Sequence, residues 1–211
     1  SGTNKSFGTS GSALSISSIK ITERAYLWYG MCVGGRAKSK SENFSRAPRS
    51  GEPALIIALR EDSMSVFNVL VADPRVEPEL AAPNGNTALM MAAFKRNKPA
   101  TLALLERGAS VNRKGWSPLH YAAAGGADDI ARLLIARGAA LDSRAPGGLT
   151  PLMMAAREGQ ESVVAVLLEA GADTALTGAD GLTAAQLAGR MDKPRIVKSI
   201  DAHREQGRRT R

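Results

Sequence analysis

Cysteine and histidine are almost absent from this chain of 211 residues, which contains one cysteine, Cys32, and two histidines, His120 and His203. A single cysteine cannot form a disulfide within the chain, and two histidines far apart in the sequence do not form a local metal-binding motif. No apolar run approaches the roughly 20 residues that a membrane-spanning helix needs. We therefore expect no disulfide framework, no metal, no cofactor and no membrane span. A chain without disulfides is compatible with the cytoplasm, the periplasm or secretion, of which we favour the cytoplasm.

The positive charge is concentrated at the two ends of the chain, whose net charge is +8. Residues 1–50 contain eight Lys/Arg and two Asp/Glu, residues 190–211 contain eight and three, and residues 51–189 contain twelve and fifteen. Basic ends can bind phosphate backbones or acidic surfaces without specificity, which leaves such binding as an alternative function. No aromatic-interleaved basic groove accompanies them, so we favour solvated ends and expect no specific nucleic acid.

The middle of the chain repeats one helical unit. In residues 115–142, Ser117 is a suitable helix N-cap and Pro118 occupies the first helical position. A glycine pair then separates this helix from a second one, which carries an apolar stripe and ends at Gly138. The unit recurs at intervals of 34, 30, 33 and 33, aligned on Ala54, Ala88, Pro118, Pro151 and Ala184. A helix–turn–helix period near 33 residues predicts a solenoid.

Two stretches make the pattern specific. Residues 117–123 read Ser-Pro-Leu-His-Tyr-Ala-Ala and residues 150–156 read Thr-Pro-Leu-Met-Met-Ala-Ala, each followed by a leucine-rich or valine-rich helix and a Gly-Ala pair. Over about residues 51–200 the chain resembles the ankyrin repeat family, and most closely its small single-domain bacterial members. The resemblance implies an all-α solenoid of about five helix–turn–helix repeats with flexible basic tails, and a non-catalytic role in binding a protein partner.

We expect three regions along the chain. Residues 1–50 are Ser/Gly-rich and basic, residues 51–203 form the ankyrin repeat domain, and residues 204–211 form a basic tail. The expected repeats are 51–83, 84–113, 114–147, 148–180 and 181–203. Repeat five is polar, as expected of a terminal cap, whereas the first helix of repeat one is apolar and needs a cover. Residues 26–33 and 43–46 are two candidate covers, and a signal peptide at residues 25–33 is the less favoured interpretation of that stretch.

No set of residues points to catalysis. His120 is the obvious acid–base candidate, but the resemblance implies that a histidine at this position hydrogen-bonds the backbone of a neighbouring turn. Asp128 and Asp129 begin a helix, where the helix dipole stabilises negative charge. We therefore expect a protein that is not an enzyme.

The resemblance places the binding surface on a concave face built by the turn tips and the exposed flank of the first helices. Tyrosine, tryptophan, methionine and arginine, the residue types enriched at interface centres, recur there. Trp116 is the expected anchor of this face, and the alternative is that its ring folds down on Tyr121 or on the next finger. The expected partner-binding residues are Asn86, Met91, Phe94, Trp116, Tyr121, Leu149, Met154, Arg157 and Leu182.

Overall fold

The structure, a computed structural model, describes residues 52–209. Within this range the chain forms ten α-helices and one 3-10 helix. In chain order they are α2 (Ala54–Arg60), α3 (Met64–Ala72), α4 (Ala88–Phe94), α5 (Lys98–Glu106), α6 (Pro118–Gly125), α7 (Asp128–Ala136), η1 (Pro146–Gly148), α8 (Pro151–Glu158), α9 (Glu161–Glu169), α10 (Ala184–Arg190) and α11 (Pro194–Arg209). The predicted all-α repeat solenoid is confirmed.

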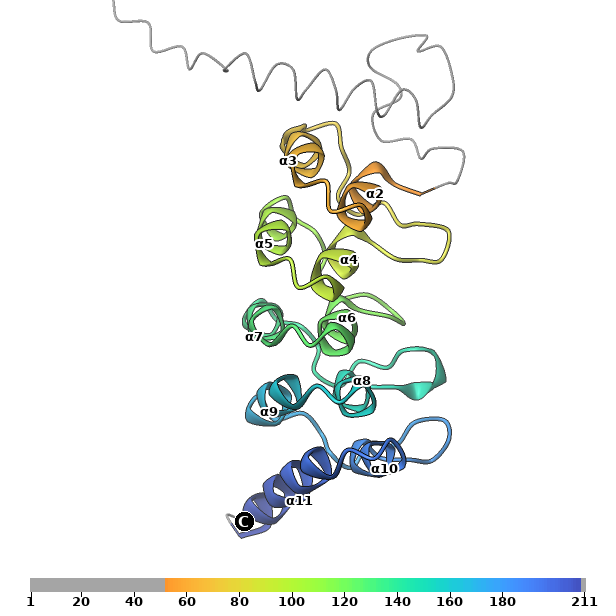
Figure 1. The fold of residues 1–211 in the computed structure, drawn as a ribbon, viewed down its shortest axis with the longest axis vertical. Coiled ribbons are helices and arrows are strands. Elements are labelled where there is room, and N and C mark those ends of the chain that lie inside the picture. The colour runs from red at the N-terminus through yellow and green to blue at the C-terminus, as the bar shows by residue number, and fades with distance from the viewer. Residues whose placement is uncertain (1–51, 210–211) are drawn as a thin grey trace, which may run out of the picture.

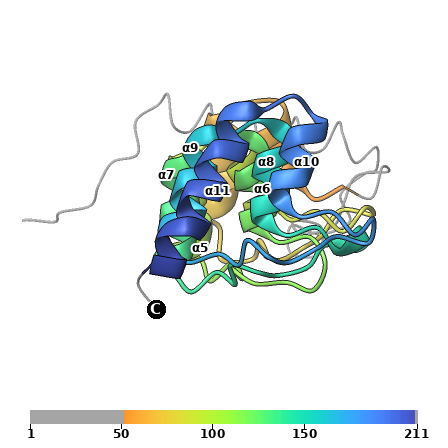
Figure 2. The same cartoon turned by 90° about the horizontal axis from the view of Figure 1, so that it is seen from below.

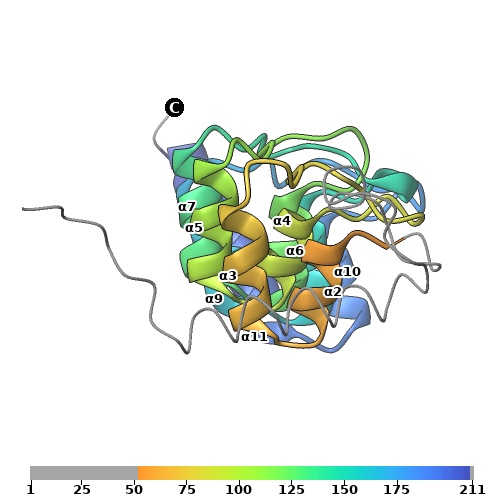
Figure 3. The ribbon, with the colours of Figure 1, turned by 90° about the horizontal axis from the view of Figure 1, so that it is seen from above.

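The helices are arranged in two parallel columns. The first helices of the repeats, α2, α4, α6, α8 and α10, form one column, and the second helices, α3, α5, α7, α9 and α11, form the other (Figure 1). The loops that join one repeat to the next, which we call fingers, all project on the side of the first helices. Views along the stack show the fingers lying over one another beyond that column (Figures 2 and 3).

Hydroxyl caps set the start of the first helices. Thr87 Oγ1 accepts the backbone N–H of Met90 at 3.4 Å, and Thr150 Oγ1 accepts that of Met153 at 3.3 Å. Each bond satisfies one of the donors that the first turn of a helix leaves without a partner. The cap positions read from the repeating sequence are therefore the positions at which the helices begin.

The core is a continuous ladder that runs from repeat to repeat. Leu89, Leu119 and Leu152 occupy equivalent positions in α4, α6 and α8, and all three are fully buried. The second helices contribute a parallel row of buried leucines, which includes Leu104 and Leu134. Since each helix pair buries its apolar side only against its neighbours, the repeats depend on one another for stability.

An arginine from the second repeat holds the irregular loop of the first. This loop lacks the Gly-Ala ending of later repeats. The guanidinium of Arg107 donates hydrogen bonds to the carbonyls of Val71, Asp73 and Val76, at 3.1 Å for Asp73 and 2.9 Å for Val76. A planar guanidinium with several donors suits such a cluster of carbonyls. The donors for these three carbonyls of the first repeat's loop therefore come from the second repeat.

The C-terminal boundary differs from the prediction. Helix α11 continues to Arg209, so residues 204–209, which we expected in a flexible basic tail, are helical. Oppositely charged residues three apart, Asp201 with Arg204 and Glu205 with Arg208, have a spacing that supports a helix. The other predictions for the ends, including the covers proposed at residues 26–33 and 43–46, lie outside the described residues.

Candidate functional site

An apolar concavity of about 160 Å³ opens on the side of the first helices, between α4, α6 and α8. Its lining is almost wholly apolar. We call it the apolar cup, and its lining residues are Phe94, Trp116, His120, Tyr121, Ala124 and Met154. Four of these six, Phe94, Trp116, Tyr121 and Met154, belong to the predicted partner-binding set.

The cup exists because a small residue lies between two large ones. Phe94, Ala124 and Arg157 are the seventh residues of α4, α6 and α8, so they are neighbours on adjacent repeats. Ala124 leaves the space between Phe94 and Met154 unfilled. The next residue, Gly125, lets α6 lie close to α4, since a Cβ atom there would be 2.3 Å from the carbonyl oxygen of Phe94. Close approach of the backbones and a missing side chain thus define the hollow.

Trp116 folds down on the first helix of its own repeat. Its ring is half-buried and meets the rings of His120 and Tyr121 edge to face, with centroids 5.5 Å and 6.2 Å apart. The finger that carries Trp116 spans residues 107–117 and is three residues shorter than the finger of residues 137–150. Of the two placements considered for this ring, the structure has the one against Tyr121. Trp116 therefore forms one wall of the cup and is not a free tip residue.

A hydrogen bond fixes Tyr121 between repeats two and three. Its hydroxyl donates to Asn86 Oδ1 at 2.6 Å, and its ring meets the edge of Phe94 with a centroid distance of 6.4 Å. Burial raises the pKa of the Tyr121 hydroxyl, and the bond to Asn86 opposes this only in part. The phenol therefore stays neutral and remains a hydrogen-bond donor that joins α6 to the finger before α4.

His120 is buried beneath the cup and uses both ring nitrogens. Its Nδ1 atom lies 2.8 Å from Ser117 Oγ and 3.3 Å from the backbone nitrogen of Ser117, which donates to it. Its Nε2 atom lies 3.0 Å from the carbonyl oxygen of Leu149, to which it donates. This pattern fits a neutral ring protonated on Nε2. Burial lowers the pKa of His120, so the neutral form is favoured.

Because the pKa of His120 is lowered from its usual 6.5, we expect stability to depend on pH. Below about pH 6.5 the unfolded chain binds more protons than the folded one at this site. The free energy of unfolding should therefore be highest above that pH. It should fall as the pH drops below it, by at most about 1.4 kcal/mol per pH unit for one proton. Urea unfolding at about pH 7.5 and about pH 5.5 measures the slope.

His120→Gln is the matched variant for this slope. Gln186, at the equivalent position of α10, accepts the backbone N–H of Thr183 at 2.8 Å, so glutamine can make the same cap without titrating. The variant should show a flatter pH dependence than the natural chain. An unchanged slope in His120→Gln would assign the pH dependence to other groups.

The remaining predicted residues are spread along the same face but do not line the cup. Three of them are half-buried: Met91 within α4, Leu149 just before α8 and Leu182 just before α10. Met154, which we expected on the exposed flank, is only 6% exposed, because it packs into the core as well as against the cup. Sequence reasoning missed Ala124, although its small size between two large neighbours was visible in the repeat alignment.

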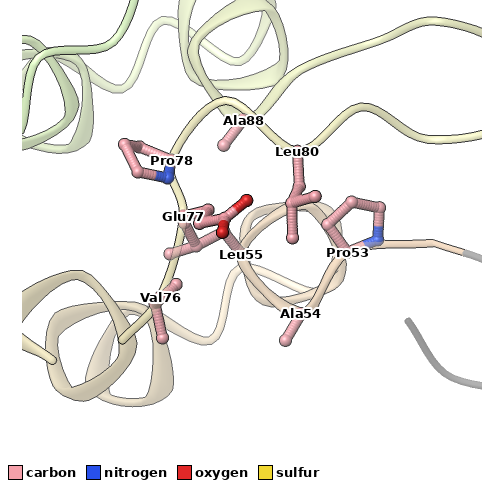
Figure 4. Close-up of a pocket in the computed structure, with 8 residues that line it drawn as sticks. All are labelled: Pro53, Ala54, Leu55, Val76, Glu77, Pro78, Leu80 and Ala88. Atoms are coloured by element: carbon pink, nitrogen blue, oxygen red, sulfur yellow. The ribbon is translucent and has the colours of Figure 1, made fainter. Parts of the chain in front are cut away.

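A second hollow lies at the start of the solenoid, between α2 and the finger that follows α3. Figure 4 shows Val76 and Pro78 on one side of it and Pro53 and Leu80 on the other, with Leu55 between them. Its space, about 10 Å³, is no more than a water molecule needs. It is a packing gap between a helix and a loop, and we do not assign it a ligand.

The described residues offer neither a metal cluster nor a membrane span. Over residues 52–209 no three His, Cys, Asp or Glu side chains come together as potential metal ligands. In the same range no helix combines the length and the apolar character that crossing a bilayer requires.

The stacked helix pairs, their fingers and the open face define a repeat protein of the helix–turn–helix solenoid class. A family model described as "Ankyrin repeats (3 copies)" matches residues 55–145 and 112–178, which together make up more than half of the chain. The chain belongs to the ankyrin repeat family. Proteins of this kind use extended concave surfaces for binding.

Curated proteins to which the chain is similar include the following three. Protein fem-1 homolog A-like from Mus musculus is 39% identical over 69 residues, which is 31% of this chain and 11% of that protein. Protein phosphatase 1 regulatory subunit 27 from Mus musculus and from Homo sapiens are each 30% identical over 93 residues, 43% of this chain and 60% of theirs. The match thus covers less than two thirds of each relative. The likeness to bacterial members stays a prediction.

Proposed function

We propose that this chain is a non-catalytic binding module that holds a protein partner against the face formed by its first helices and fingers. The proposed contact residues are the nine predicted from the sequence, with the apolar cup at their centre. Two of the relatives are named as regulatory subunits of a phosphatase, which supports a role in binding another protein.

The exposure of Phe94 is the observation that carries the proposal. Its side chain is 49% exposed at the edge of the cup, whereas most large apolar side chains in residues 52–208 are buried. An exposed phenylalanine beside an apolar hollow leaves hydrophobic surface in water, and covering that surface is favourable. Aromatic side chains of this kind are frequent anchors at the centres of interfaces.

The hydrogen bonds of the obvious catalytic candidates support a non-catalytic role. His120 is fully buried, its Nε2 atom donates to the Leu149 carbonyl, and its Nδ1 atom accepts the backbone N–H of Ser117, so the ring serves to hold two turns together. Asp128 and Asp129 lie in the first turn of α7, and Asp129 is 3.5 Å from Lys98 Nζ. These carboxylates stabilise a helix start and a contact between repeats.

Truncating Trp116 to alanine tests the proposal. The full chain is immobilised, a captured protein is identified and purified, and its Kd is measured with the natural chain and with Trp116→Ala. Removing an aromatic wall of the binding face should weaken binding at least about tenfold. Because the ring packs on Tyr121 and His120, we also expect a stability loss of about 1–2 kcal/mol.

Leu134→Ala is the control with the opposite behaviour. Leu134 is fully buried in α7, away from the cup, so its truncation should cost about 2–5 kcal/mol of stability. Measured where the variant is still folded, its Kd should equal that of the natural chain. Unchanged affinity in Trp116→Ala contradicts binding through this face. If that unchanged affinity also falls steeply with salt, it favours the basic ends instead.

A further inference from the structure

We infer that the apolar cup selects its partner by accepting one bulky apolar side chain from a segment that also carries carboxylates on the side of repeats four and five. The inference rests on the proposed function, since it specifies which protein segment the same face binds. Its elements are the size of the cup, the chemistry of its lining and the distribution of arginines along the first helices.

The size of the cup matches one large side chain. A cavity of about 150 Å³ lined by apolar residues accommodates a benzene molecule, and the cup offers about 160 Å³. A phenylalanine or leucine side chain is therefore of suitable size. The rings of Phe94, Trp116 and Tyr121 surround the space, and aromatic edges and faces pack well against another ring.

The lining disfavours a polar occupant. The His120 ring donates to the Leu149 carbonyl and accepts from Ser117, while the Tyr121 hydroxyl donates to Asn86. A polar side chain that enters the cup would lose water and find these groups already paired, which costs affinity. The site thus distinguishes a leucine or phenylalanine from a glutamine of similar length.

Phe94 and Ala124 belong to a row formed by the seventh residues of the first helices. Beyond the cup, toward the C-terminus, this row continues with two arginines. Arg157 and Arg190 are the seventh residues of α8 and α10. Arg190 is exposed and forms no ion pair within the described part of the chain, and Arg157 has only an exposed neighbour, Glu158, at 2.9 Å. An exposed pair of this kind contributes little and is readily exchanged for a partner carboxylate.

At the other end of the row the positive charge is already compensated. Arg60, the seventh residue of α2, pairs with both Glu52 and Glu61, and their hydrogen bonds raise its pKa. Arg60 thus pairs with two carboxylates, Arg157 with one and Arg190 with none within the described residues, so the less compensated charge lies on the side of the cup toward the C-terminus of the solenoid. A partner segment with its carboxylates on that side is complementary to this asymmetry.

Charge also argues against two other occupants. Residues 1–50 of the chain contain eight Lys/Arg and two Asp/Glu, the same sign as Arg157 and Arg190. A second copy of the chain carries a net charge of +8, which its two ends supply. The net charge of both occupants is positive, whereas an acidic partner is attracted by Arg157 and Arg190 and by the basic ends of the chain.

The repeat spacing sets the distance between the apolar and acidic positions. Packed helices lie about 8–10 Å apart. An extended segment advances about 3.3 Å per residue, so a carboxylate that reaches Arg157 lies roughly three residues from the apolar side chain, and one that reaches Arg190 roughly six.

The test uses the full chain and a displayed library of random peptides of about twelve residues, long enough to span the cup and both arginines. Selected peptides should share a bulky apolar position with Asp or Glu roughly three to six residues to one side. A selection without binders above background, or binders without the apolar position, overturns the inference.

Fluorescence polarisation with one selected peptide then tests the cup itself. Ala124→Phe fills the cup and should weaken binding of the peptide at least about tenfold. Ala136→Phe, at an exposed position of α7, is the matched control and should bind normally. Phe94→Ala removes one wall of the cup and should also weaken binding. Because Phe94 is half-exposed, this variant tests the cup even if Ala124→Phe folds poorly.

Replacing both arginines tests the charge. The double variant Arg157→Gln and Arg190→Gln should lower affinity about tenfold at low salt and flatten the salt dependence. Binding that Trp116→Ala weakens but Ala124→Phe leaves intact overturns the inference and leaves the proposed function standing. Binding that neither variant weakens contradicts both.

Discussion

Gly125→Ala should destabilise the protein by about 3 kcal/mol and distort the cup. The added Cβ would lie 2.3 Å from the carbonyl oxygen of Phe94, a backbone atom that cannot move aside without shifting α4. Because Phe94 forms the wall of the cup, a shift of α4 should also weaken partner binding. Urea unfolding followed by circular dichroism measures the free-energy change.

Gly189→Ala is the matched control for this variant. Gly189 is also a helical glycine, near the end of α10, and the nearest atom to an added Cβ is a Val197 methyl carbon at 4.0 Å. Alanine should fit there, and its higher helix propensity should leave stability unchanged or raise it by up to about 1 kcal/mol. Equal effects of the two substitutions would mean that the close approach of α6 to α4 is not what requires glycine at position 125.

Removing repeat five should destabilise the whole array. A chain truncated after Asp180 lacks α10 and α11, which pack on α8 and α9. It leaves Val166, Leu167 and Leu168, at present 3%, 0% and 4% exposed, at the end of the stack. We expect a loss of at least about 3 kcal/mol, since one buried aliphatic side chain already contributes about 1.5–3 kcal/mol.

Truncation after Ala202 serves as the control. Ile200 is the last buried apolar residue of α11, and most of the residues that follow are exposed. This chain loses Arg204 and Arg208 but no core, so its melting temperature should stay close to that of the full chain. If the chain that ends at Asp180 melts at the same temperature as the one that ends at Ala202, repeat five does not act as a cap.

The repeating architecture could be predicted from the sequence because its determinants are local. The hydroxyl caps at Thr87 and Thr150 and the glycine at Gly138 act within one helix or turn, so their spacing determines where helices begin and end. The apolar period identifies core positions such as Leu134 for the same reason. The end of α11 was misplaced because charged residues are compatible with both a tail and a helix.

The candidate site depended on contacts between repeats, which are far apart in the chain. The repeat alignment placed Phe94, Trp116 and Tyr121 on one face, but it could not give the direction of the Trp116 ring, the burial of Met154 or the hollow above Ala124. Each of these depends on how closely α4, α6 and α8 approach, and that distance is set by side-chain volumes on neighbouring helices. The sequence by itself thus determined the period and the caps of the helices. Only the tertiary structure decided that the small side chain of Ala124 leaves a cup between Phe94 and Met154, because an empty volume is a property of packed neighbours and not of any one segment.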